Sequence, residues 1–180
     1  MQGTAYPGSA RNGIPMWVAG GGERKTLRIA AEYADYTNFD GTPEVFTTKS
    51  EILAGHCRDV GRAYDEIVRS ANYNVFIGRD QAEVEDRLNW MYEHFLRGGV
   101  PEKVARRQVE SLRTQPLVGT PEQILETLAD LERRGMTYAI CYFAEAAYDT
   151  TGIDLFERRV LPELVRHEGH GHRFGHRHGH

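Results

Sequence analysis

The sequence predicts an α/β fold in which parallel strands are covered by helices. Short apolar segments alternate along the chain with longer segments of helical periodicity, which is the pattern of βα units. The connections between successive strands are long enough to cross over a sheet, so the strands are expected to run parallel. Hydrophobic residues make up 40% and charged residues 27% of the 180 residues, which is typical of a globular protein and not of a disordered chain.

The first two βα units are predicted from apolar runs and helix-start signals. A strand is expected at residues 14–19 (IPMWVA), because this apolar run ends at the three glycines 20–22. A helix should follow from Glu23, and a short strand should follow at residues 36–39. The next helix is expected to begin at Thr42, because Thr is a good N-cap and the proline after it suits the first helical position.

A third strand is predicted at residues 70–77 (SANYNVFI), where apolar residues alternate with asparagines. A helix should follow it, because apolar residues recur at helical spacing from Val84 to Phe95. A more basic helix is expected at residues 101–113, and a capping box at Thr120 should start a further helix.

The fourth strand is predicted at residues 137–143 (TYAICYF), and a last helix from about Thr151. Because this strand is nearly all apolar, both of its faces are expected to be covered, with Tyr138, Tyr142 and Phe143 in the barrel core or in contact with helices and not in a base-stacking platform. The four βα units amount to half of a (β/α)8 TIM barrel, whose full length is typically about 250 residues. An open four-stranded sheet with helices on both faces is the alternative.

The composition divides the chain and limits its partners. Residues 1–13 are expected to be a flexible lead-in, residues 14–166 one domain, and residues 167–180 a disordered His-rich tail. The formal net charge of −4 shows no basic excess for nucleic acid, and no apolar run of about 18 residues predicts a membrane span. The N-terminus lacks the features of a signal peptide, so the predicted location is cytoplasmic, with Cys57 and Cys141 reduced and packed.

The sharpest local feature is the Gly-rich turn, which we define as Gly20, Gly21, Gly22, Glu23 and Arg24. It leads from a predicted strand into a predicted helix. Glycines let a backbone approach a ligand closely, and the start of a helix offers free N–H groups that suit a phosphate. A tight turn with solvated charges is the alternative. The turn is neither a P-loop nor a GxGxxG fingerprint.

Four motifs in order resemble the bacterial luciferase-like flavin oxidoreductases. They are PMWVAGGGERKTLRIAAEYADYTNF at residues 15–39, LAGHCRDVGRAYDEI at 53–67, LVGTPEQ at 117–123 and LFERRVLPEL at 155–164. Within the family, the ERKTL turn and the helix containing Cys57 look most like members that use coenzyme F420, with FMN as the alternative cofactor. The resemblance implies a (β/α)8 barrel with an insertion, of which this chain matches only the C-terminal half.

The resemblance also suggests a site. The five residues of the Gly-rich turn match the segment that holds the phosphate end of the cofactor. Asn38 lies at the C-terminal end of the second predicted strand, and Glu145 follows the last strand by two residues. Barrel active sites form at this end of the strands, so Asn38 could contact cofactor or substrate and both residues are candidates for the substrate pocket. The alternatives are an asparagine that caps the next loop and a solvated loop glutamate. No catalytic residue is assigned, because the family places much of that apparatus in the first half.

The first functional hypothesis is an oxidoreductase that uses F420 or FMN for hydride transfer or monooxygenation, incomplete or inactive as this half alone. The alternative is a non-enzymatic half-barrel that binds phosphate or other anions, or assembles with itself or with a partner half-barrel. A small-molecule substrate and a homo-oligomer are expected. No catalytic metal site is predicted. The histidines of the tail suggest adventitious metal binding, a native metal-handling tail or an added sequence; they are His167, His170, His172, His176, His178 and His180.

Overall fold

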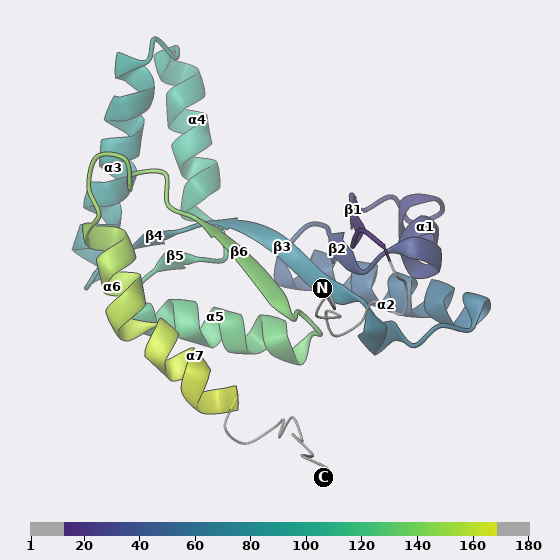
Figure 1. The fold of residues 1–180 in the computed structure, drawn as a ribbon. Helices are drawn as coiled ribbons and strands as arrows, with labels where there is room; N and C mark the ends of the chain where they lie inside the picture. The colour runs from purple at the N-terminus through teal and green to yellow at the C-terminus, as the bar shows by residue number, and fades with distance from the viewer. Residues whose placement is uncertain (1–12, 169–180) are drawn as a thin grey trace. The chain divides into compact units, whose positions relative to one another are not determined.

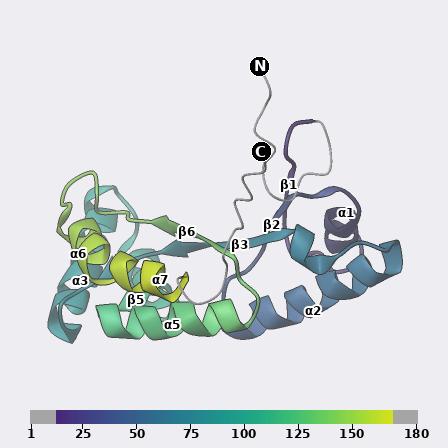
Figure 2. The same ribbon diagram turned by 60° about the horizontal axis from the view of Figure 1, so that its bottom comes forward.

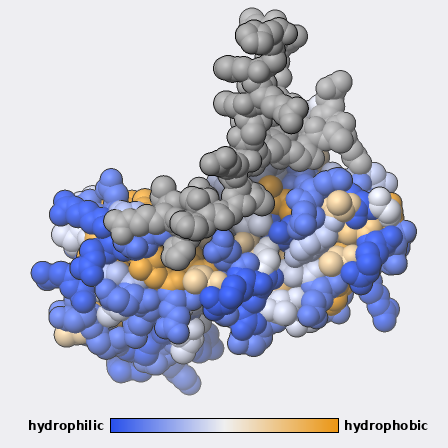
Figure 3. Space-filling view, turned by 90° about the horizontal axis from the view of Figure 1, so that it is seen from below, coloured by the Kyte–Doolittle hydropathy of each residue, from blue (hydrophilic) through white to orange (hydrophobic). Residues whose placement is uncertain are grey.

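The computed structural model describes residues 13–168, which form two compact units. Unit 1 consists of residues 13–74 and 127–142, and unit 2 consists of residues 75–126 and 143–168. Apart from Gly13 and the end of the last helix, the predicted lead-in and His-rich tail lie outside the described residues. The surface seen in Figure 3 is largely hydrophilic, with apolar side chains gathered in a few areas.

Unit 1 contains a four-stranded parallel sheet, which confirms the predicted direction of the strands. Its strands are β1 (Trp17–Ala19), β2 (Tyr36–Asn38), β3 (Val68–Asn74) and β6 (Tyr138–Tyr142), in the order β1-β2-β3-β6 (Figure 1). The register places Trp17 opposite Tyr36, and Ser70 opposite Tyr138. The β3–β6 pair therefore joins segments far apart in the sequence.

Helices α1 (Thr26–Tyr33) and α2 (Pro43–Val60) supply the core of unit 1, and a 3-10 turn (Tyr64–Glu66) precedes β3. Figure 2 shows α2 along one side of β3. The buried helix residues include Leu27, Ala30, Phe46, Leu53 and Cys57. They fall at helical spacing because α1 and α2 each bury one apolar face. Gly61 ends α2 in the left-handed conformation, as expected of a C-cap glycine.

One face of this sheet is covered and the other is open. Thr37, Arg69, Ala71 and Tyr73 point to the covered face and are buried. On the open face, Tyr138, Ile140 and Tyr142 of β6 are exposed. The prediction that both faces of this strand are covered was therefore wrong for the described chain, because β6 is an edge strand whose residues are exposed on the open face and, at Ala139, on the other face as well.

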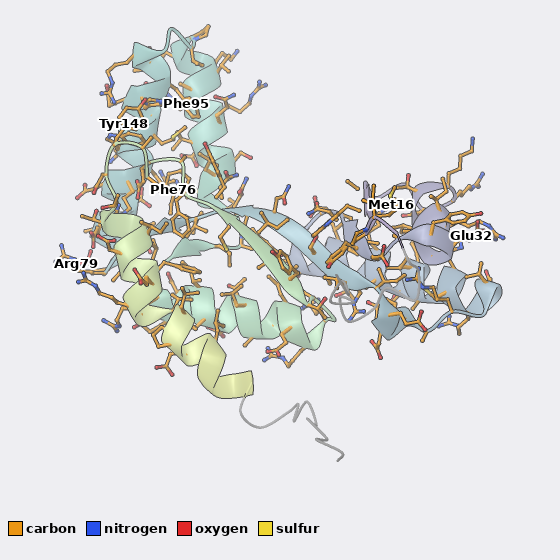
Figure 4. The ribbon with its side chains drawn as sticks, viewed as in Figure 1. Met16, Glu32, Phe76, Arg79, Phe95 and Tyr148 are labelled. Carbon is orange, nitrogen blue, oxygen red and sulfur yellow. The ribbon has the colours of Figure 1, made fainter. Side chains whose placement is uncertain are left out.

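Unit 2 is built around a helical hairpin. Helices α3 (Gln81–Arg97) and α4 (Glu102–Arg113) lie side by side, as Figure 1 shows. A two-stranded parallel sheet of β4 (Phe76–Ile77) and β5 (Val118–Gly119) packs with them, followed by α6 (Thr151–Arg159) and α7 (Leu161–Glu168). The core contains Phe76, Val84, Leu88 and Val109, with Phe95 partly buried against it (Figure 4).

Helix α5 (Pro121–Arg133) begins in unit 2 and ends in unit 1. Its predicted capping box is confirmed, because the Gln123 side chain accepts a hydrogen bond from the Thr120 N–H at 2.9 Å. The position of the Thr42 N-cap is also confirmed, but its hydroxyl donates to Asp40 at 2.7 Å instead of capping the helix.

Several predicted boundaries differ from the structure. The strand predicted at residues 70–77 divides at Val75 into β3 and β4, which belong to different sheets. The helix predicted from Glu23 begins at Thr26, because residues 23–25 form a turn. The last helix breaks after Arg159, just before Pro162, which cannot continue the hydrogen-bond ladder. Helix α7 reaches Glu168, so the first two residues of the predicted tail are helical.

Candidate functional site

The Gly-rich turn leaves β1 and enters α1, and the geometry restricts two of its glycines, Gly20 through its backbone and Gly22 through a neighbouring side chain. Gly20 has a φ of 114°, which side-chain-bearing residues rarely adopt. A Cβ at Gly22 would lie 2.8 Å from Thr26 Oγ1, closer than a real Cβ comes. A side chain at Gly20 would therefore strain the backbone, and one at Gly22 would require the Thr26 side chain to move.

The turn also presents unpaired amides. Within the described part of the chain, none of the N–H groups from Gly21 to Arg24 donates a hydrogen bond. The first bond across the turn runs from the Leu27 N–H to the Gly22 carbonyl at 3.0 Å. These amides lie at the positive end of α1, where an anion is stabilised.

Helix α2 brings a lysine to this turn. Lys49 Nζ lies 2.8 Å from Glu23 Oε1, and a Cβ at Gly21 would lie 3.3 Å from Lys49 Cε. The hydrogen bond from Lys49 and its positive charge lower the pKa of the Glu23 carboxyl. His56, two helical turns further along α2, donates from Nε2 to the Glu23 carbonyl oxygen at 2.7 Å, since a carbonyl can only accept.

The sequence analysis did not include Lys49 and His56 in the site. Their seven-residue spacing on a predicted helix places them on one face, next to the stripe of Phe46, Leu53 and Cys57. This spacing could have predicted that the two side chains share a face of the helix. It could not have predicted that this face contacts the Gly-rich turn. Arg24, which was predicted, is exposed and forms no hydrogen bond or ion pair among the described residues.

Asn38 lies beside the Gly-rich turn, because the Gly20 N–H donates to the Asn38 carbonyl at 2.8 Å. Its side-chain Nδ2 donates to Ser70 Oγ and Asn72 Oδ1, both at 3.1 Å. Ser70 Oγ in turn donates to the Thr37 carbonyl at 2.7 Å. The alternative of a loop cap was therefore wrong. We call Asn38, Ser70 and Asn72 the amide network; it lies on the open face of the sheet.

Glu145 belongs to unit 2 and is buried, with 4% of its surface exposed. Its Oε1 accepts a hydrogen bond from Arg87 Nη1 at 2.5 Å. Arg87 Nη2 also donates to Glu83 at 3.1 Å and to Thr151 at 3.0 Å. The alternative of a solvated loop glutamate was wrong, because α3 supplies an arginine that pairs with the carboxylate.

The Arg87–Glu145 pair borders a cavity of about 480 Å³ in unit 2. Arg79, which projects from the start of α3 in Figure 4, also lines it. Five carboxylates face these two guanidinium groups, and the complete lining is Arg79, Asp80, Ala82, Glu83, Asp86, Arg87, Trp90, Glu145, Asp149 and Thr151. Burial raises the pKa of Glu145, while the charge and hydrogen bond of Arg87 act in the opposite direction.

The two described cysteines are free thiols. Burial raises the thiol pKa of both Cys57 and Cys141, and neither forms a disulfide. Among residues 13–168, no three His, Cys, Asp or Glu side chains gather in a group that could hold a metal ion. No helix in this range has the length and apolarity needed to cross a bilayer.

Comparison with known proteins identifies the family. The family model described as luciferase-like monooxygenase matches residues 1–138. The chain belongs to this family. No curated protein gives a significant sequence match. The resemblance inferred from the four motifs is thus confirmed at the level of the family.

Several solved structures share the fold of this chain. The coenzyme F420-dependent tetrahydromethanopterin reductase of Methanopyrus kandleri has a TM-score of 0.62 at 17% identity, covering 83% of this chain and 51% of that chain. The long-chain alkane monooxygenase LadA has a TM-score of 0.61 at 19% identity, covering 91% and 43%. Riboflavin lyase with modified FMN has a TM-score of 0.62 at 16% identity, covering 85% and 43%. The chain therefore spans about half the length of these proteins.

Proposed function

We propose that the chain is the C-terminal half-barrel of an F420-dependent oxidoreductase, with FMN as the alternative cofactor. Family membership supports the class of chemistry, and two structures of similar fold are described with F420 and with FMN. The observation that carries the proposal is the Gly-rich turn, whose open amides lie beside Lys49.

The residues of the turn fit the phosphate end of either cofactor. Both cofactors carry a phosphate group, and backbone N–H groups at a helix start are suited to bind one. Lys49 adds a positive charge from α2. The bound ring supplies hydride transfer or reaction with oxygen, while the protein provides position and exclusion of water.

Glu23 sets the strength of this interaction. Its carboxylate already pairs with Lys49, so an arriving phosphate shares or displaces that contact. The carboxylate also repels an anion at the same turn. The proposed role of Glu23 is therefore to moderate affinity, and the proposed role of Gly20, Gly21, Gly22 and Arg24 is to bind the phosphate.

The two remaining predicted residues have separate roles in this proposal. Asn38 contacts cofactor or substrate through the amide network, where Asn38 Oδ1 and the Asn72 amide N–H groups remain available among the described residues. Glu145 acts as an acid in the cavity of unit 2, held by Arg87. The identity of the substrate does not follow from either group.

The phosphate site is tested by titrating the chain with F420, FMN and riboflavin while following fluorescence. Riboflavin carries the same ring as FMN without the phosphate, so it should bind roughly tenfold or more weakly if the phosphate is the anchor. Equal affinity for FMN and riboflavin would contradict the role of the turn. Comparing F420 with FMN then selects the cofactor.

Lys49→Gln tests the lysine, with Lys103→Gln on the exposed surface of α4 as the matched control. Lys49→Gln should weaken the binding of F420 or FMN roughly tenfold, which is the contribution of one charge-assisted hydrogen bond. Lys103→Gln should leave this affinity unchanged. Equal losses in both variants would point to general electrostatic attraction and not to a site.

A non-enzymatic phosphate-binding module is the second candidate function. The Gly-rich turn favours it, because the turn offers hydrogen-bond donors to a phosphate whether or not that phosphate is attached to a flavin or deazaflavin ring. In that case inorganic phosphate should bind to the wild-type chain and lose affinity in Lys49→Gln, while neither F420 nor FMN binds more tightly than phosphate.

A further inference from the structure

The sheet of unit 1 carries an aromatic and aliphatic surface on its uncovered side. Strand alternation and register place five residues on this side, which we call the open-face cluster: Trp17, Tyr36, Tyr138, Ile140 and Tyr142. Trp17 is 43% exposed, Tyr138 is 50% exposed and Tyr142 is 62% exposed. Large apolar patches of this kind mark interaction surfaces in soluble proteins.

The open face is concave. Trp17 stacks on Tyr36 with ring centroids 4.5 Å apart, and Trp17 meets the edge of Tyr138 at 6.0 Å. Strands β1 and β6 are three strand spacings apart, or roughly 14 Å across a flat sheet. Their side chains meet because the sheet curls toward the open face, as the wall of a barrel does.

The sequence of β6 also indicates a missing cover. A nearly continuous apolar strand is typical of parallel sheets in which both faces are buried. Here four of its five residues are exposed, and the strand pairs only with β3 among the described residues. An exposed apolar strand at the edge of a sheet can pair with a strand of another chain.

We propose that a second copy of the chain covers the open face, so that two four-stranded sheets close into one eight-stranded barrel. Both edge strands, β1 and β6, run parallel to the rest of the sheet. A twofold axis along the strands therefore places β6 of one protomer beside β1 of its partner in parallel, and the same contact forms again on the opposite side. One symmetry operation pairs both edges and buries both open-face clusters.

The dimer would also complete the proposed ligand site. Asn38, Ser70 and Asn72 lie on the same face as the cluster, so the second copy encloses the amide network. This point alone rests on the proposed function. The association itself depends only on the sheet, and it can be measured without any cofactor.

The test measures the mass of the cofactor-free chain by analytical ultracentrifugation over a range of concentrations. A species of twice the monomer mass is expected. Ile140→Asp should raise the dimer dissociation constant roughly tenfold or more, because it places a charge in the buried cluster. The matched control is Ile29→Asp on the exposed side of α1, which should leave the mass unchanged. Circular dichroism verifies that both variants are folded.

Trp17 provides a second readout that is local to the open face. The chain has two tryptophans, so Trp90→Phe leaves Trp17 as the sole indole. Its emission should shift to shorter wavelength as the concentration passes the dissociation constant, because the ring becomes buried. In the Ile140→Asp background this shift should move to higher concentration.

Three outcomes would overturn the proposal. A monodisperse monomer at all concentrations would show that a second copy does not cover the face. A dimer that is insensitive to Ile140→Asp, with constant Trp17 emission, would place the interface elsewhere. Open-ended oligomers would exclude the closed twofold arrangement. A confirmed dimer that binds neither F420 nor FMN would leave the association standing and remove only the proposed cofactor.

Discussion

The Glu23 carboxylate pairs with Lys49, the lysine of the proposed phosphate site, at a distance of 2.8 Å. Glu23→Gln should therefore tighten the binding of FMN or F420, because the variant removes both the competing ion pair and the repulsion. This gain in affinity should disappear at high salt, because the Glu23 carboxylate is exposed and its charge is screened. Isothermal titration of wild type and variant at two ionic strengths measures this. A loss of affinity would instead assign Glu23 a direct contact with the cofactor.

The Arg87–Glu145 pair is the most buried ion pair of unit 2, with both side chains less than a tenth exposed. Removing one partner of a buried pair typically costs about 3–5 kcal/mol, because the other charge remains uncompensated. Arg87→Leu should therefore lower the free energy of unfolding by about this amount near neutral pH. Urea unfolding checks the value, and Arg87→Leu with Glu145→Leu should recover part of the loss.

The same pair gives a pH dependence of defined sign. Burial raises the pKa of Glu145 above its ordinary value, so the folded chain holds this proton more tightly than the unfolded chain. Its contribution to the free energy of unfolding is fully present at pH below the unfolded pKa, and it is lost as the pH rises through the raised folded pKa. In Arg87→Leu this loss of stability should extend to higher pH, because Arg87 lowers the pKa of Glu145 and the variant removes that effect.

Urea unfolding between pH 5 and pH 8, in steps of about half a unit, would show the difference between wild type and Arg87→Leu. The double variant with Glu145→Leu lacks the titrating group, so its curve should be flatter. A steep curve in the double variant would assign the pH dependence to another carboxyl, of which Glu83 and Asp149 are the nearest.

Among the turns between secondary-structure elements, the one from β4 into α3 is crowded by backbone atoms. A Cβ at Gly78 would lie 2.5 Å from the Val84 backbone nitrogen and 2.9 Å from the Asp80 carbonyl. Backbone atoms cannot move aside as a flexible side chain can. Gly78→Ala should therefore destabilise the chain by about 1–3 kcal/mol, as overpacking does.

Gly55→Ala is the matched control in the middle of α2. There the nearest atom to an added Cβ is the flexible end of Arg58 at 3.7 Å. This variant should gain about 0.5–1 kcal/mol, because alanine favours a helix interior more than glycine does. Equal effects of the two substitutions in urea unfolding would contradict the crowding at Gly78.

The elements that the sequence predicted well are those with strong local signals. The strand at 36–39 and the capping box at Thr120 depend on residues close in sequence, and both are present. The break at Val75 was missed, because Val75, Phe76 and Ile77 are all buried and the alternation gives no boundary there. Strand β5 was missed because two residues are too short to show a period.

Contacts between distant segments explain what the sequence left open in the candidate site. The order of motifs located the Gly-rich turn and Asn38, but not Lys49, which reaches the turn only once α1 and α2 pack together. Similarly, Glu145 was a candidate without a partner until α3 placed Arg87 beside it. Side-chain pairs of this kind have no period that a sequence pattern can reveal.

For the molecule as a whole, the proposed function predicts little or no turnover from this chain alone. The chain spans about half the length of the similar structures, and no catalytic residue is assigned within it. Stopped-flow measurement should find that reduced FMN reacts with oxygen at the same rate with and without the chain. A marked acceleration would show that this half contains the reactive apparatus.

The pairing of β3 with β6 also affects the order of folding. Arg69 and Thr137 are hydrogen-bonded neighbours, although 68 positions separate them in sequence. During synthesis β1, β2 and β3 leave the ribosome well before β6, so unit 2 has most of its chain available before the sheet of unit 1 can be finished. Pairings of high sequence separation form slowly. A nascent chain that stops before residue 138 would expose the edge of β3, and its lifetime in the cell would depend on chaperones.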